Sequence, residues 1–226
     1  MLKKYRTQIL LVYYVIFMIL LASLPITANI MSFLADGDIN KASEYLTIFL
    51  YATHIILFVI ICLTFGEEIK IKYKDFFTNW KKNLKYIILG FISIFIANMI
   101  IGLFIQKSGS NQETLSIMQQ GSVGIMIVCF YLITVIIAPI NEEIIFRRIL
   151  IGDGKSYLSV IGSLILSSIA FGLIHIHNIK EITLVIPYIC TGAILGFVYI
   201  KNNNIITSIS LHILNNLVGV ILLLFI

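Results

Sequence analysis

The sequence predicts an all-α protein, a polytopic bundle of about seven transmembrane helices. Hydrophobic residues make up 59% of the 226 residues and charged residues only 12%, and the mean hydropathy is +1.02. A soluble domain of this length keeps a largely polar outside, so it cannot hide that share of apolar surface. The apolar residues also form long blocks, several of which reach the roughly 20 residues that span a bilayer. Backbone groups in lipid must be bonded within their own segment, so the spans are helices.

Seven apolar blocks meet the length criterion for a spanning helix. They cover about residues 8–34, 45–65, 84–105, 122–151, 157–176, 182–200 and 205–226. The first block follows MLKKYR but lacks a small-x-small cleavage site, so we expect an uncleaved signal-anchor. No internal repeat, low-complexity tract or soluble domain interrupts the series, and we expect residues 1–226 to form a single transmembrane domain.

Lysine and arginine residues are distributed unevenly between the two predicted sides of the membrane. With a cytoplasmic N-terminus, only Lys41, Lys107 and Lys180 of the 16 such residues fall outside. The positive-inside rule therefore predicts a multi-pass protein of the cell membrane with its N-terminus in the cytoplasm. This asymmetry accounts for the net charge of +5, so no nucleic-acid partner is needed. The Lys-rich connection 66–85, which contains Trp80, is expected to rest on anionic lipid of the bilayer.

One apolar block contains a charged segment, APINEEIIFRRIL at residues 138–150. A charge at the bilayer centre costs about 3 kcal/mol on insertion scales, so such residues tend to be paired, to face a cavity or to be functional. Glu143 and Arg147 are four residues apart and share a helix face, which predicts an ion pair. Glu142 is rotated from Glu143 by about 100° and has no basic residue three or four positions further on, which leaves it for chemistry. Pro139 lacks a backbone N–H, which predicts a kink near Glu142.

Polar side chains recur in two later blocks. His175 lies near the end of the fifth block, and His212 and Asn216 lie well inside the seventh. His212 and Asn216 are four residues apart, so both side chains can point at one object. Together with Glu142 these residues offer a base, a partner for it and two neutral donors. In a straight hairpin turning at 152–156, however, Glu142 and His175 would differ in depth by about 15 Å.

These residues resemble the motifs of the CPBP intramembrane proteases, also called the Abi or CAAX-protease family. The motifs of that family are EExxxR, FxxxH and HxxxN or HxxxD. They occur here in the family's order as Glu142-Glu143-x-x-x-Arg147, Phe171-x-x-x-His175 and His212-x-x-x-Asn216. The resemblance covers about residues 122–220, the expected catalytic core, whereas the spans within 8–105 are not diagnostic. Arg148 departs from the family, whose members often carry Gly there, and we expect it to mark the cytoplasmic end of its span.

The resemblance implies a glutamate intramembrane protease that needs neither a metal nor another cofactor. The implied catalytic residues are Glu142, His175, His212 and Asn216, with Glu143, Arg147 and Phe171 as structural support. In this scheme the first Glu and the His of the second motif activate a water, and the third motif stabilises the oxyanion. The implied partner is a membrane-associated protein or peptide, in peptide processing or bacteriocin self-immunity. The Ile-, Asn- and Lys-rich composition suggests a bacterium, where a prenylated CAAX protein would be an unusual substrate.

Two other interpretations remain open. Glu142, His175 and His212 would also make a two-His, one-carboxylate zinc set for a metal-dependent protease, in which Asn216 would have no role as a ligand. A non-catalytic scaffold, transporter or immunity protein is the other class. GxSxG, Walker and HExxH motifs are absent from the sequence, so it offers no serine nucleophile, nucleotide site or zincin centre of those kinds.

Overall fold

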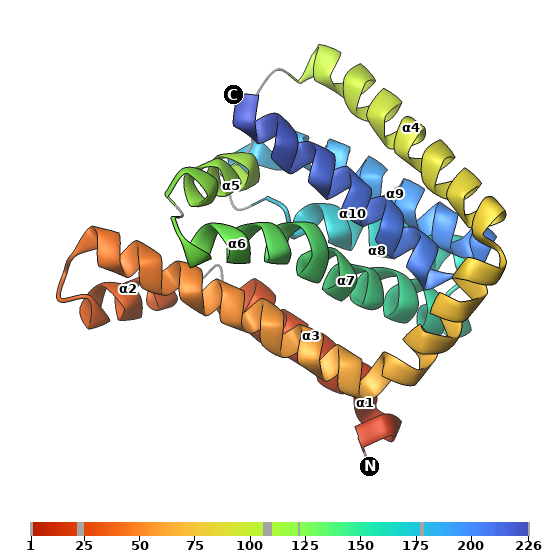
Figure 1. Ribbon diagram of the computed structural model, residues 1–226, viewed down its shortest axis with the longest axis horizontal. Helices are drawn as coiled ribbons and strands as arrows, with labels where there is room; N and C mark the ends of the chain where they lie inside the picture. The colour runs from red at the N-terminus through yellow and green to blue at the C-terminus, as the bar shows by residue number, and fades with distance from the viewer. Residues whose placement is uncertain (1, 22–24, 106–109, 122, 177–178, 226) are drawn as a thin grey trace.

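The computed structural model describes residues 2–21, 25–105, 110–121, 123–176 and 179–225, in which every regular element is a helix (Figure 1). The α-helices are α1 (Leu2–Tyr13), α2 (Pro25–Leu34), α3 (Ile39–Thr78), α4 (Trp80–Phe104), α5 (Ser110–Gly121), α6 (Ile125–Leu132), α7 (Ala138–Glu143), α8 (Val160–Leu173), α9 (Val185–Asn202) and α10 (Ile205–Leu222). Three segments are π-helical: η1 (Tyr14–Leu21), η2 (Ile133–Ile137) and η3 (Ile144–Asp153). Three are short 3₁₀ helices: η4 (Gly154–Ser156), η5 (Ile179–Leu184) and η6 (Leu223–Phe225). The predicted all-α class is confirmed, while Lys107 lies outside the described residues.

The described residues form a multi-pass membrane protein with slightly fewer spans than predicted. Five helical segments are long and apolar enough to cross a membrane: Ile39–Thr78, Trp80–Phe104, Ile125–Ser156, Lys180–Asn202 and Ile205–Phe225. A sixth arises if the bent pair near the N-terminus counts as one span, with an angle of 68° between its two helices. The predicted span at 157–176 contains only the 14-residue helix α8, which is shorter than the roughly 20 residues of a full crossing.

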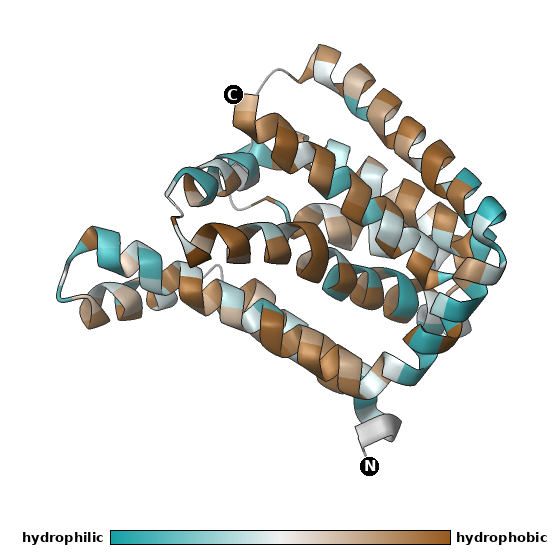
Figure 2. Cartoon of the chain, viewed as in Figure 1, coloured by the Kyte–Doolittle hydropathy of each residue, from teal (hydrophilic) through white to brown (hydrophobic). Residues whose placement is uncertain are grey.

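The connection expected at 66–85 is mostly helical. α3 begins after Asp38, whose carboxylate accepts hydrogen bonds from two backbone N–H groups, and it continues without a break to Thr78. The charged stretch GEEIKIKYK contains good helix formers and no proline, so the helix persists where hydrophobicity ends. A helix of 40 residues is about 60 Å long, roughly twice the hydrocarbon thickness. Figure 2 shows the resulting hydrophilic region where α3 ends and α4 begins.

A polar cluster joins η3 to α1 and α3. Arg148 pairs with Glu68 of α3 and with Asp153, and its side chain is only 18% exposed. Arg6 of α1 reaches the same Glu68 at 3.4 Å, and both guanidinium groups lie over the Phe65 ring, at 4.1 and 5.5 Å. Arg148 therefore does more than mark the end of a span, because it holds α3 against the segment that carries the first motif.

The elements that carry the three motifs meet in one core. α10 contacts α3, α4, α7, α9 and η2, and α8 packs between η3 and α9 (Figure 1). The core includes side chains of α3, η3, α8, α9 and α10 that are at most 2% exposed: Phe65, Phe146, Phe171, Leu195 and Leu211. Packing therefore brings α7, α8 and α10 together although they are far apart in the sequence.

Glycines allow α8 and α9 to approach closely. A Cβ atom on Gly172 would lie 2.5 Å from Ile189 Cγ1 and 3.2 Å from the Ile189 backbone nitrogen. A Cβ atom on Gly192 would lie 3.2 Å from Ser168 Cα and 3.3 Å from its carbonyl oxygen. Small residues at such crossings let helix backbones pack together in the absence of a hydrophobic driving force between helices. These two positions therefore set the separation of α8 and α9.

Gly172→Ala should destabilise the fold, whereas the matched change Gly219→Ala in α10 should not. At Gly172 the added methyl meets Ile189, and overpacking of this kind costs about 1–3 kcal/mol. At Gly219 nothing lies within 4 Å of the new Cβ, so only the better helix propensity of alanine remains, at most about 1 kcal/mol in favour. Reversible unfolding of the two purified variants in mixed micelles measures both effects. Equal stability of the two variants would contradict the close packing of α8 and α9.

Candidate active site

Glu143 is the centre of a buried polar network. Its side chain is fully buried, with Oε1 3.1 Å from Arg147 Nη1. The same Oε1 accepts a hydrogen bond from His212 Nδ1 at 3.0 Å, and Oε2 accepts one from Ser208 Oγ. Arg147 and His212 are also inaccessible, at 0% and 2% exposure. The ion pair expected from the i, i+4 spacing is thus present, and the network extends it to α10.

Arg147 connects this network to α8 and α9. Its Nη2 donates to the carbonyl oxygen of Gly192 at 3.2 Å, and its guanidinium carbon lies 4.5 Å from the centre of the Phe171 ring. The contact between Nη1 and Glu143 lacks hydrogen-bond geometry, so it is an ion pair only. The buried cation is therefore compensated by a carboxylate, a carbonyl dipole and an aromatic face together.

Glu142 faces the other nitrogen of His212. Glu142 Oε2 lies 3.7 Å from His212 Nε2, beyond hydrogen-bond distance. This buried oxygen has no hydrogen-bond partner within the ranges that the structure describes. A separation of this size suits one further oxygen atom bonded to both groups. Glu142, which has no basic neighbour on its own helix, is thus the carboxylate whose oxygen can still accept a hydrogen bond.

The register between η3 and α8 sets the depth of His175. Ser167 Oγ donates to the carbonyl oxygen of Phe146 at 2.7 Å, which places these two residues at the same level. Counting four-residue turns from this pair, His175 lies about 6 Å from the level of Glu142, and not about 15 Å. The difference arises because the connection runs to Ser159, whose side chain caps α8 at Gly162 N, and so is longer than a turn at 152–156.

His175 stands in the turn that follows α8. Its Nδ1 lies 2.7 Å from the carbonyl oxygen of Phe171, and because a carbonyl only accepts, Nδ1 carries the proton. In the neutral form of this ring the lone pair is then on Nε2. The ring stacks on Tyr188, with centroids 4.5 Å apart and planes at 15°. The Phe171 ring contacts His175 on one side of the site and meets His212 edge-on at 5.6 Å, so one aromatic ring links the two motif histidines.

Asn216 is bonded to the helix that carries the first motif. Its Nδ2 donates to the carbonyl oxygen of Thr134 in η2 at 3.1 Å. The N–H of Ala138, directly after η2, bonds to the carbonyl of Ile133 five residues back, as in a π-helix. Thr134 is five residues before Pro139, which has no N–H to donate. The backbone thus takes up Pro139 by π-helical turns on both sides of α7, and Asn216 satisfies a carbonyl that the proline leaves open.

Several partners in this site are missing from the sequence-based set, among them Ser208, Tyr188 and the carbonyl groups of Gly192 and Thr134. Ser208 could have been found, because it precedes His212 by four residues and so lies on the same face of α10 as Asn216. The carbonyls of Gly192 and Thr134 carry no sequence signal of their own. The structure brings Glu142, Glu143, Arg147, Ser208 and His212 together directly, and Phe171 and Asn216 tie them to His175 and η2.

A metal-dependent site would need at least three ligands at one point. Within the described residues no group of three His, Cys, Asp or Glu side chains has an arrangement that could hold a metal ion. Glu142 and His212 are neighbours, whereas His175 is held at Phe171 and Tyr188. A zinc set of Glu142, His175 and His212 would therefore require His175 to change its position.

Glu143→Gln and Glu142→Gln should affect folding differently. Removing one member of a buried ion pair leaves an uncompensated charge and costs about 3–5 kcal/mol, so Glu143→Gln should lower the amount of folded protein. Glu142 has no ion-pair partner at hydrogen-bond distance, so Glu142→Gln should leave that amount nearly unchanged. The comparison uses the amount of each variant recovered in the membrane and, for the purified proteins, the SDS concentration at the midpoint of unfolding. Equal losses would show that the two carboxylates are not distinct in role.

Residues 124–218 match the family model described as Rce1-like, type II CAAX prenyl endopeptidase. The chain is 30% identical over 210 residues to an uncharacterised protein of Mycoplasma capricolum. The aligned region covers 87% of this chain and 61% of that protein. It is 25% identical over 195 residues to the membrane-embedded CAAX protease MroQ of Staphylococcus aureus, covering 79% and 73% of the two chains. It is 30% identical over 117 residues to YdiL of Bacillus subtilis, named as a candidate membrane peptidase. This alignment covers 52% of this chain and 44% of YdiL.

These matches agree with the motifs. The chain spans less than two thirds of the length of the Mycoplasma and Bacillus relatives. No solved structure matches the chain significantly. The region that matches the family model contains Glu142, Phe171, His175, His212 and Asn216, in the order of the three motifs. Over this region, which carries all three motifs, the chain is similar to membrane-embedded CAAX proteases, and its helices include several that are able to span a membrane.

Proposed function

We propose that this chain is an intramembrane endopeptidase that hydrolyses a peptide bond with a water activated by Glu142. The observation that carries the proposal is the position of His212 between two carboxylates, with Nδ1 bonded to Glu143 and Nε2 facing Glu142. Both oxygens of Glu143 are bonded to other side chains, whereas the buried Oε2 of Glu142 has no hydrogen-bond partner in the part of the chain that the structure describes. Such paired carboxylates with different surroundings are typical of acid–base sites.

The first step is attack of water on the carbonyl carbon. Glu142 removes one proton from a water, and the water oxygen bonds to the carbonyl carbon of the peptide bond. The second proton of the water stays on its oxygen and is donated in a hydrogen bond to His175 Nε2. The proton then passes from Glu142 to the leaving nitrogen as the C–N bond breaks, which yields an amine and a carboxylic acid. The neutral His175 ring suits this task because its Nδ1 proton is already donated to Phe171 O.

The oxyanion is stabilised by α10. His212 donates from Nε2 and Asn216 from its second amide N–H, since the first is held by Thr134 O. Both ring nitrogens of His212 then donate, Nδ1 to Glu143 and Nε2 to the oxyanion. Glu143 and Arg147 serve as positioning residues, because they hold His212 in place.

The substrate is a membrane-associated protein or peptide, with peptide processing or bacteriocin self-immunity as the expected setting. The name of the S. aureus relative describes a CAAX protease embedded in the membrane, which supports a peptide substrate that meets the site in or at the bilayer. A substrate can be found by comparing the peptides released from membranes of cells that express the wild-type chain and Glu142→Gln. A scaffold or immunity protein without catalysis would give identical peptide profiles.

With a peptide identified in this way, Asn216→Ala should reduce kcat by about 10²–10³-fold with little change in KM, because one of its two amide N–H groups donates to the oxyanion in this scheme. The change also removes the bond to Thr134 O, so the rates are compared per folded molecule. Asn215→Ala removes only a 3.4 Å hydrogen bond to Asn216 Oδ1, and this comparison variant should retain activity. EDTA and phenanthroline should have no effect. An active Asn216→Ala variant, together with chelator-sensitive cleavage that added zinc restores, would favour the metal-dependent alternative with Glu142, His175 and His212 as ligands.

The N-terminus is proposed to be cytoplasmic in the cell membrane, from the distribution of Lys and Arg. Lys41 and Lys74 lie near the two ends of the unbroken helix α3, about 50 Å apart, so they should be on opposite sides of the bilayer. In a cysteine-free background, an impermeant thiol reagent added outside intact cells should label Lys41→Cys and not Lys74→Cys. The reverse labelling pattern would invert the orientation.

A further inference from the structure

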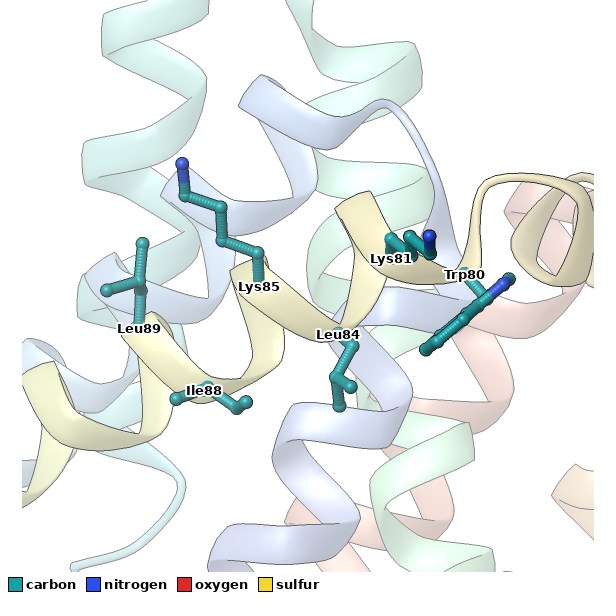
Figure 3. Close-up of a pocket in the computed structure, with 6 residues that line it drawn as sticks. All are labelled: Trp80, Lys81, Leu84, Lys85, Ile88 and Leu89. Carbon is teal, nitrogen blue, oxygen red and sulfur yellow. The ribbon is translucent and has the colours of Figure 1, made fainter.

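A shallow hollow lies on the outward face of α4, near its start (Figure 3). Its volume is about 330 Å³, and its lining consists of Trp80, Lys81, Leu84, Lys85, Ile88 and Leu89. All six residues belong to α4, and none belongs to the three motifs. The opposite face of the helix, with Asn83, Ile87, Gly90 and Ile94, is buried against the bundle. The hollow is therefore separate from the candidate active site and faces away from the bundle.

The lining changes from cationic to apolar along the helix. Lys81, Lys85 and Leu89 form one ridge at four-residue spacing, and Trp80, Leu84 and Ile88 form the next. Figure 3 shows Lys85 and Leu89 leaving the helix on one side and Leu84 and Ile88 on the other. Two ammonium groups thus stand near the start of α4, and hydrocarbon continues from them toward the middle of the span. A phospholipid has the same order of a charged headgroup followed by acyl chains.

The two lysine charges are not neutralised by the protein. Neither Lys81 nor Lys85 makes an ion pair in the part of the chain that the structure describes. α4 contains no Asp or Glu, and the carboxylate of Asp75 just before it accepts hydrogen bonds from Asn79 and Asn204 at 2.8 and 2.7 Å. An anion that binds at these exposed lysines would therefore come from outside the chain.

The apolar lining is placed where lipid is the surrounding medium. α4 is one of the five segments able to cross a membrane, and its hydropathy changes from hydrophilic to hydrophobic at this hollow (Figure 2). Leu84, Ile88 and Leu89 are each about half exposed. Trp80 has the amphipathic ring that favours the headgroup level of a bilayer. The hollow can thus contact the headgroup and an acyl chain of the same lipid.

We infer that this hollow binds an anionic phospholipid, with its phosphate between the ammonium groups of Lys81 and Lys85. An acyl chain lies along Leu84 and Ile88, on the ridge that begins with Trp80, and the Trp80 indole sits beside the headgroup. The site makes no use of the motif residues, so it stands whether or not the chain is catalytic. The lipid would fix the depth of α4, which contacts both α9 and α10.

The test uses the single tryptophan of the chain, Trp80, as a reporter at the site. The full chain is reconstituted in bilayers of phosphatidylcholine and phosphatidylglycerol, in which one lipid at a time carries bromine on its acyl chains to quench tryptophan fluorescence. A basic residue near a surface attracts anionic lipid by a factor of roughly five. We expect brominated phosphatidylglycerol to compete for Trp80 at least roughly that much better than brominated phosphatidylcholine at equal mole fraction.

Three double variants distinguish a site from general surface charge. Lys81→Gln/Lys85→Gln should bring the two lipids to parity, and Lys81→Arg/Lys85→Arg should keep the preference. Lys155→Gln/Lys201→Gln removes the same charge outside the hollow and should also keep it. Equal quenching by both lipids in the wild-type chain, a preference that survives the first variant, or equal loss in the first and third variants would each overturn the inference. The lysines are exposed, so unchanged helical circular dichroism is expected for all variants.

Discussion

The carboxylate of Glu143 is the group on which the arrangement of the core depends. A carboxylate with no exposed surface is tolerable only if its charge is compensated and its oxygens are bonded, since the penalty for burying an ion is several kcal/mol. The three groups that meet this need come from two elements, Arg147 from η3 and both Ser208 and His212 from α10. Arg147 in turn requires Gly192 O of α9. The same charge therefore assembles the fold and orients a histidine that the proposed chemistry uses.

A second constraint is the need to satisfy backbone carbonyls in a medium without water. The π-helical segments on either side of α7 change the backbone pairing, and side chains from other helices supply the missing donors. Asn216 bonds to Thr134 O, and Ser167 bonds to Phe146 O. Each bond joins a short polar side chain to a backbone atom on a neighbouring helix. The irregular helix that carries the first motif is thus held by α8 and α10 and not by its own hydrogen bonds alone.

Composition and spacing were sufficient for the fold class and for one contact of the site. Hydropathy predicts helices because lipid leaves few other options, and four-residue spacing predicts the pair of Glu143 and Arg147 because it is local to one helix. The pairing of Arg148 with Glu68 could not be predicted, since the two residues are 80 positions apart and only packing brings them together. The depth of His175 depended on how the chain turns before α8, and the helical course of 66–78 depended on propensity where hydropathy had ended.

The start of α10 is attached to the end of α3. Asn204 caps α10 by accepting from Ile206 N at 2.9 Å, and its amide nitrogen donates to Asp75 Oδ2 at 2.7 Å. Ser208, His212 and Asn216 follow at intervals of four residues. One residue inserted between the cap and Ser208 would turn all three side chains by about 100° and advance them by about 1.5 Å, so that they would miss Glu143 and Thr134 together. The number of residues in this stretch is therefore as essential to the site as their identity, and length variation can be accommodated only elsewhere in the chain.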